Sequence, residues 1–88
     1  MKVQFEHSFA KDLKAVDDRT VLRRVQSLIE QLESSTRLQD IAQVKALEGE
    51  RGYYRVRIGD YRLGIVLEGD TVILVRILHR KEIYRYFP

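Results

Sequence analysis

The stretch from Tyr53 to Leu63 constrains the fold of this 88-residue chain more than any other part of it. Tyr54, Val56 and Ile58 alternate with charged or polar neighbours, which is the two-residue period of a half-buried β-strand. Gly59-Asp60 then separates this run from a second strand-like run, and a two-residue link that contains glycine is typical of a β-hairpin. The sequence therefore predicts strand, tight turn and strand, with one face buried.

Two further runs extend the predicted sheet. Val72 to Leu78 begins with residues that are apolar on both faces, which is typical of a strand inside a sheet. The turn Glu68-Gly69-Asp70 precedes it, so this strand forms a meander with the hairpin. Val3 and Phe5 alternate with polar residues and indicate a short N-terminal strand.

Two helices are predicted between the first strand and the meander. Ser8 is a candidate N-cap for a helix that runs to about Val16. Asp18 is a candidate N-cap for a longer helix over residues 19–33, whose apolar residues recur at helical spacing. We expect the two helices to form an antiparallel hairpin that covers the apolar face of the sheet. Residues 38–47 fit either one or two short helical turns or a packed loop.

This order of elements predicts one α+β domain over residues 1–88: a short N-terminal strand, an antiparallel helix hairpin and a three-stranded antiparallel meander. The chain has no cysteine, which excludes disulfides, thiolate nucleophiles and Cys-based metal sites and fits a reducing cytoplasm. Its two histidines, His7 and His79, are far apart in sequence, so we expect no metal ion and no other cofactor. No apolar run reaches the roughly 18 residues of a membrane span.

Charge is distributed unevenly along the chain. Residues 1–50 carry eight Lys/Arg and nine Asp/Glu, a net charge of −1, whereas residues 51–88 carry eight and four, a net charge of +4. A solvated face could give the same count. Cations concentrated in the predicted sheet nevertheless favour an anionic partner.

The arginines of the predicted sheet can gather on one face. Because the helices must cover the apolar face, Arg55 and Arg57 are expected on the open one. Arg62 starts the adjacent strand, and Arg76 shares a two-residue period with Arg80, so up to five guanidiniums could line one surface. The acids of this half lie mainly in turns and cannot neutralise such a cluster. Guanidinium groups bind phosphate by bidentate hydrogen bonds, so RNA is the expected ligand.

The segment after the last strand adds further candidates. His79 can act as an acid or base near neutral pH, although a histidine at a strand end is often only exposed. Tyr84 and Tyr86 can stack on bases, although tyrosines here also suit edge packing. The candidate RNA-binding residues are the cations Arg76, Lys81 and Arg85, together with Tyr86.

Taken together, these residues resemble the RelE/ParE superfamily, the toxins of bacterial and archaeal toxin–antitoxin modules. The resemblance spans essentially the whole chain. It rests on the element order, on the run from Lys45 to Gly49 that leads into Tyr53 to Leu63, and on the closing run from His79 to Arg85. It implies a RelE-like fold, a cytoplasmic toxin and a cognate antitoxin that covers the basic face.

The RelE branch of this superfamily cleaves messenger RNA in the ribosomal decoding site without a metal ion. A ribose 2′-OH attacks the adjacent phosphorus and leaves a cyclic phosphate and a free 5′-OH. The positions that resemble the catalytic residues of this branch are Arg55, Arg57, Arg62, Arg80 and Tyr84, or Tyr86 in place of Tyr84. In this comparison Arg80 protonates or stabilises the leaving oxygen, and the tyrosine stacks on a base.

The chain also departs from that branch. Some members carry lysine where this chain has Arg55 and Arg57, and a guanidinium keeps its proton at neutral pH. This leaves His79 as the candidate general base, or else a mechanism that is almost wholly electrostatic. Some relatives use a Glu–His pair, but Glu48 is out of register for that role. Two alternatives remain: ParE-like members poison DNA gyrase and cleave no RNA, and a degenerate member would only bind its antitoxin.

Overall fold

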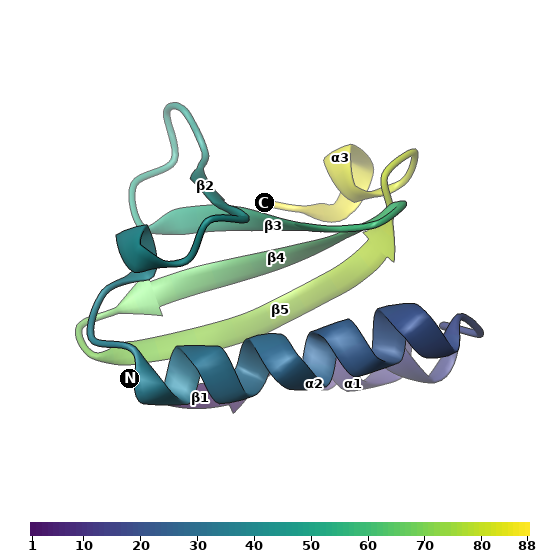
Figure 1. Ribbon diagram of the computed structural model, residues 1–88. Helices are drawn as coiled ribbons and strands as arrows, with labels where there is room; N and C mark the ends of the chain where they lie inside the picture. The colour runs from purple at the N-terminus through teal and green to yellow at the C-terminus, as the bar shows by residue number, and fades with distance from the viewer.

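The computed structural model describes residues 1–88. Along the chain its elements are β1 (Lys2–Phe5), α1 (His7–Lys14), α2 (Arg19–Ser34), a 3₁₀ turn (Leu38–Asp40), β2 (Val44–Ala46), β3 (Tyr53–Ile58), β4 (Tyr61–Glu68), β5 (Thr71–His79) and α3 (Ile83–Tyr86). The five strands form one sheet in the order β1-β5-β4-β3-β2. Helices α1 and α2 lie on one side of this sheet, and α3 with the C-terminus lies on the other (Figure 1).

The predicted meander is confirmed. Strands β3, β4 and β5 are antiparallel neighbours, with Val56 opposite Leu63 and Leu63 opposite Ile77. Gly59 has a φ of 58°, which glycine adopts at little cost and which the tight turn between β3 and β4 requires. Strand β5 lies between β1 and β4, so its apolar residues are interior as predicted.

The sheet is larger and more mixed than the sequence predicted. Strand β1 pairs in parallel with β5, with Val3 opposite Val72. Strand β2 adds a fifth strand antiparallel to β3, with Val44 opposite Val56. It falls within residues 38–47, where the sequence pattern fitted either helical turns or a loop. A three-residue strand is too short to show a two-residue period by itself.

The helix boundaries test two predicted caps. The Asp18 carboxylate accepts hydrogen bonds from the N–H groups of Thr20 (2.9 Å) and Val21 (3.2 Å), which confirms it as the N-cap of α2. The predicted Ser8 cap is wrong. Helix α1 has Glu6 at its N-cap position, without a side-chain cap, and it ends at Lys14.

Ser8 serves the sheet instead. Its Oγ donates a hydrogen bond to the Val75 carbonyl at 2.6 Å. Strand β1 ends at Phe5, whereas β5 continues to His79, so the edge of β5 beyond β1 needs other partners. Side chains of α1 provide them.

The apolar core lies between the sheet and the two longer helices. It includes Val25 and Leu32 of α2 and Val56, Leu63 and Leu74 of the strands, all at most 2% exposed. Helix α1 packs mainly against β5, and α2 against β1 and β3, so both helices cover the predicted face. None of the helices has the length and hydropathy that a membrane crossing requires. The other face of the sheet is free of helices apart from α3.

Candidate functional site

A groove of about 610 Å³ opens on the face of the sheet that α1 and α2 leave uncovered. Ala42, Gln43, Gly59 and Tyr84 line part of it. No carboxylate lines it. Five cations from α2, β2, β3 and β4 line the rest, and we call this site the basic groove: Arg24, Lys45, Arg55, Arg57 and Arg62.

The strand register places like charges directly opposite one another in the basic groove. Lys45 of β2 is opposite Arg55 of β3, and Arg57 of β3 is opposite Arg62 of β4. Like charges in such cross-strand positions repel and destabilise a sheet. The molecule has one salt bridge, and none of these four residues takes part in it. Their positive charge is therefore not neutralised, which favours binding of a polyanion.

Tyr84 covers one of these arginines. The Arg55 Cζ lies 4.5 Å from the centroid of the Tyr84 ring, which is a cation–π contact. Tyr84 as a whole residue is nevertheless 69% exposed. Helix α3 is held in place by Ile83, which is fully buried, and by Phe87, whose ring packs over Gly64. Tyr84 is thus presented to the groove with most of its surface available for stacking.

Arg62 is oriented by the hairpin turn. Its Nη1 donates hydrogen bonds to the carbonyl oxygens of Gly59 and Tyr61, each at 2.9 Å. These bonds use one nitrogen and leave the rest of the guanidinium for a ligand. Tyr84 lines the groove, whereas Tyr86, the alternative that the sequence analysis left open, does not.

Arg76, which the sequence analysis placed among the RNA-binding residues, lies outside the basic groove. Its Nε and Nη2 donate to the Asp12 carboxylate of α1 at 2.7 and 3.0 Å, and its Cζ lies 5.3 Å from the centroid of the Tyr86 ring. Asp12 also accepts a hydrogen bond from the Ile77 N–H at 3.1 Å. The hydrogen bonds to Asp12 raise the pKa of Arg76. Arg76 therefore joins α1 to the sheet.

His79 is not brought together with the arginines either. It is opposite Tyr61 on β4, and the two rings meet edge-on with centroids 5.8 Å apart. Tyr61 packs against the core, whereas its neighbour Arg62 lines the groove, because adjacent residues of a strand point to opposite faces. His79 therefore lies on the helix side of the sheet end, where its Nδ1 accepts a hydrogen bond from the Lys81 N–H at 3.2 Å.

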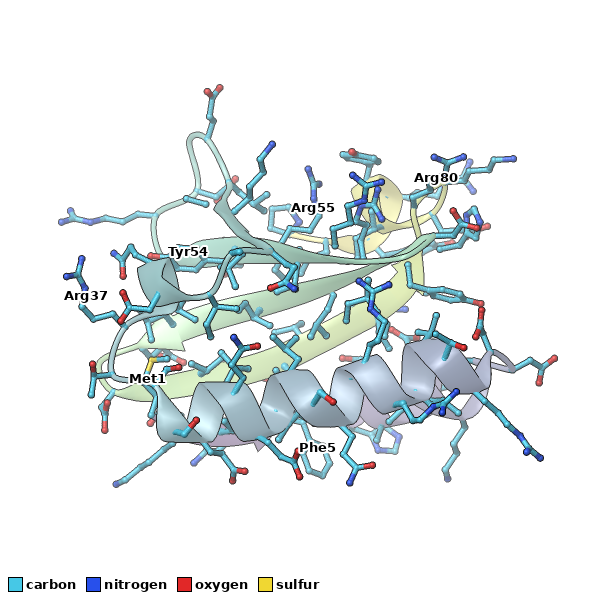
Figure 2. All side chains as sticks on the ribbon, in the orientation of Figure 1. Met1, Phe5, Arg37, Tyr54, Arg55 and Arg80 are labelled. Carbon is cyan, nitrogen blue, oxygen red and sulfur yellow. The ribbon has the colours of Figure 1, made fainter.

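The remaining predicted residues surround the site without lining it. Arg80, Lys81 and Arg85 are exposed and do not line the basic groove. Figure 2 shows Arg80 and Arg55 above the sheet, on the side opposite α1 and α2. The Arg80 N–H donates to the Asp60 carbonyl at 2.7 Å, which fixes the backbone there.

Sequence analysis missed two cations of the basic groove. Arg24 belongs to α2, yet its Nη1 lies 3.6 Å from the position that a Cβ on Gly59 would occupy. This approach of a helix to a hairpin turn is a long-range contact that no local pattern reveals. Lys45 lies in the short strand β2, and only its pairing with Arg55 brings it to the site. No group of three or more His, Asp or Glu side chains is placed to hold a metal ion.

Comparison with known proteins gives a consistent assignment. The family described as "ParE toxin of type II toxin-antitoxin system, parDE" matches residues 3–84. Toxin RelE3 of Methanocaldococcus jannaschii is 46% identical over 89 residues, which cover 100% of both chains. A chain of the RelB-RelE antitoxin-toxin complex from Methanococcus jannaschii is 42% identical, with 97% of this chain and 99% of that chain covered and a TM-score of 0.84.

A more distant structure has the same fold. A chain of the archaeal RelE-RelB complex from Pyrococcus horikoshii is 23% identical, with 90% of this chain and 93% of that chain covered and a TM-score of 0.73. The mixed five-stranded sheet with two helices on one face is thus shared where the sequence has diverged. The chain belongs to the RelE/ParE superfamily of type II toxin–antitoxin toxins.

Proposed function

We propose that this toxin is a ribosome-dependent mRNA endoribonuclease and that the basic groove is its active site. The observation that carries the proposal is the pairing of Lys45 with Arg55 and of Arg57 with Arg62, without a carboxylate in the groove. Folding gains nothing from placing like charges opposite one another. A phosphate whose negative charge increases during a reaction is, by contrast, strongly stabilised by clustered cations.

The proposed step is an internal transfer at one phosphate. The ribose 2′ oxygen forms a bond to phosphorus, and the bond from phosphorus to the 5′ oxygen breaks, which gives a 2′,3′-cyclic phosphate and a 5′-OH. The 2′-OH loses a proton, and the leaving 5′ oxygen gains one. Guanidiniums at Arg55, Arg57 and Arg62 stabilise the charge on the pentacovalent phosphorane. As in the RelE branch that this chain resembles, the proposed step uses no metal ion.

The location of His79 decides whether it can take the proton of the 2′-OH in the proposed reaction. A base must reach the 2′-OH within hydrogen-bond distance, directly or through one water. His79 lies on the helix side with Tyr61, away from the groove, so we assign it no role as the base. We propose a mechanism that is mainly electrostatic, with solvent accepting the 2′ proton. Arg80 stands on the groove side, beyond the residues that line the groove, and is proposed to stabilise charge on the leaving oxygen, which takes its proton from solvent.

Tyr84 is the proposed base-stacking residue. Its exposed ring stands beside Arg55, so a base stacked on it would bring the adjoining phosphate toward the guanidiniums. Stacking would thereby position the scissile phosphate, because orientation is a large part of a catalytic effect that uses no strong base.

The proposed partner is an antitoxin. Two solved relatives are complexes of RelE with RelB. We propose that a cognate antitoxin covers the basic groove with an acidic segment that folds on binding and so blocks the site. Action on ribosomes also implies a cytoplasmic protein.

One observation favours a second candidate function. The matching family is described by its ParE members, and inhibition of DNA gyrase without RNA cleavage is the alternative for this chain. A gyrase inhibitor needs a complementary surface, but it has no need for four cations paired across three strands beside an exposed tyrosine. The basic groove therefore supports the nuclease over the inhibitor.

The test is an assay of both activities with the same protein. Purified toxin is added to ribosomes programmed with a defined mRNA and, separately, to DNA gyrase in a supercoiling assay. We expect cuts with 5′-OH ends that are lost in Arg55→Ala and retained in Arg37→Ala, an exposed arginine outside the groove. Absence of cleavage together with gyrase inhibition would establish the second candidate.

A further inference from the structure

The basic groove does not end at the edge of the sheet. Strand β2 begins at Val44, opposite Val56, so the outer edge of β3 beyond Val56 lacks a neighbouring strand. There only a 3.4 Å hydrogen bond from the Arg57 N–H to the Gln43 carbonyl joins the two segments. At this gap a second hollow, of about 110 Å³, opens between β3 and α2. Arg24, Gln43 and Arg57 line both the groove and the hollow, so the two are continuous.

The hollow differs from the groove in its chemistry. Its floor is apolar and comes from core residues that are at most 5% exposed: Leu28, Val56 and Ile58. Its rim carries the neutral polar side chains of Ser27, Gln31 and Gln43. All three are exposed, and none of their side chains makes a hydrogen bond within the molecule. No carboxylate lines the hollow.

This combination suits a planar heterocycle. An apolar floor accepts the face of a ring, and free amide and hydroxyl groups match the donors and acceptors at its edge. Glutamine side chains recognise nucleobases in this way, and single-stranded RNA is read mainly through bases that are splayed out of a stack. The hollow lies beside a cationic groove that suits the phosphate of the same chain.

We propose that the hollow is a nucleobase-binding subsite for the nucleotide next to the one that is cleaved, and that Arg24 holds the phosphate between them. Arg24 is the helix residue that reaches both sites, and it makes no ion pair. The proposal deepens the proposed nuclease function and rests on it for its biological meaning. It assigns to the toxin itself a base preference at one position beside the cut.

The first test varies the base at each position that flanks the cut in mRNA on programmed ribosomes. We expect cleavage by the wild type to differ by about tenfold or more among the four bases at one flanking position. In the double variant Gln31→Ala with Gln43→Ala, the best base should lose this advantage, so that the four rates agree within about threefold. Gln26→Ala, on α2 but outside the hollow, is the matched control and should keep the wild-type preference.

Arg24→Ala should act differently from the glutamine variants. We expect it to lower cleavage of all four sequences by the same factor, about tenfold, because a phosphate contact carries no base information. Arg23→Ala is the control, since Arg23 is exposed on the same helix and lines neither hollow nor groove. A double glutamine variant that keeps the wild-type preference, or that loses activity equally for all bases, would overturn the subsite.

A binding measurement separates this proposal from the nuclease proposal. A short single-stranded RNA, made uncleavable by 2′-O-methyl groups, is titrated into ¹⁵N-labelled toxin while the side-chain amide signals of Gln31 and Gln43 are followed. We expect these signals to shift with the intact RNA and to remain in place with the same backbone lacking bases. Shifts without cleavage would leave the subsite standing and refute the nuclease. Cleavage without shifts would do the reverse.

Discussion

Arg76 of β5 and Arg57 of β3 belong to the same sheet but meet opposite electrostatic environments. Arg76 makes two hydrogen bonds to Asp12, and that carboxylate also binds the Ile77 N–H. Arg57 has no acid within reach and lies opposite another arginine, Arg62. The first arrangement stabilises the docking of α1, whereas the second works against folding. Stability accounts for the paired arginine but not for the unpaired cations, so the unpaired cations are the candidates for function.

The largest effect is expected when an acidic residue is introduced into the basic groove, so that an unpaired arginine there becomes paired like Arg76. Lys45→Glu places a carboxylate opposite Arg55, in the position that pairs across β2 and β3. We expect cleavage on programmed ribosomes to fall about 100-fold, since one cation is lost and another is neutralised. The free energy of unfolding should rise by roughly 0.2–1 kcal/mol, because a repulsive cross-strand pair becomes attractive. Lys45→Gln, which removes the charge alone, should fall between this variant and the wild type in both assays.

The reverse experiment removes the acid from the paired arginine. Asp12→Ala should lower the free energy of unfolding by about 2 kcal/mol, because hydrogen bonds to a charged group are lost and Arg76 is left partly buried without its partner. Urea unfolding measures the change. Asp17→Ala is the control, since Asp17 is exposed and makes no side-chain hydrogen bond or salt bridge. Equal stability of the two variants would contradict the structural role of Arg76.

A third prediction concerns Phe87, the side chain that anchors α3 and so holds Tyr84 beside Arg55. A Cβ at position 64 would lie 2.5 Å from two atoms of the Phe87 ring, so Gly64→Ala must displace that ring. We expect a loss of about 1–2 kcal/mol in unfolding free energy, which is typical of overpacking. Because Phe87 anchors α3, Tyr84 should also leave Arg55, and cleavage by the folded protein should drop. Gly49→Ala is the control: its Cβ meets nothing within 4 Å, but its φ of 77° strains the backbone, so it should lose stability without displacing Phe87 and keep normal cleavage per folded molecule.

The smallest expected effect is that of salt. Raising NaCl from 0.1 to 1 M shortens the screening length from about 10 to about 3 Å, which weakens repulsion within the basic groove. The unfolding free energy of the wild type in urea should rise by about 0.3 kcal/mol, within the range for one cross-strand pair. Lys45→Gln should gain less, because one repulsive pair is already absent. A gain that is the same in both proteins would place the repulsion elsewhere.

Local patterns predicted the parts of the fold that depend on neighbours in sequence. The hairpin at Gly59, the cap at Asp18 and the alternation of Val56 and Ile58 were all found from spacing, since each is decided within a few residues. The cap predicted at Ser8 was wrong because its hydroxyl donates to a strand carbonyl 67 residues away, so a tertiary hydrogen bond outweighed the local preference for capping.

The site was only partly predictable for the same reason. Arg55, Arg57, Arg62 and Tyr84 lie together as the strand period and the family resemblance predicted. Arg24 could not be found, because only the packing of α2 brings it to the hairpin. Arg76 and His79 have side chains that suit the proposed chemistry, but the fold places them elsewhere. Arg76 is paired with Asp12, and His79 lies against Tyr61 on the helix side of the sheet.

The contrast between the unpaired Arg57 and the paired Arg76 is tested by comparing Arg57→Gln with Arg76→Gln, with cleavage on programmed ribosomes and urea unfolding measured for both. We expect opposite results. Arg57→Gln should lose most of its cleavage while its unfolding free energy stays equal to that of the wild type or rises. Arg76→Gln should be clearly less stable yet cleave normally per folded molecule. Loss of cleavage in a stable Arg76→Gln, or destabilisation of Arg57→Gln as large as that of Arg76→Gln, would contradict this contrast.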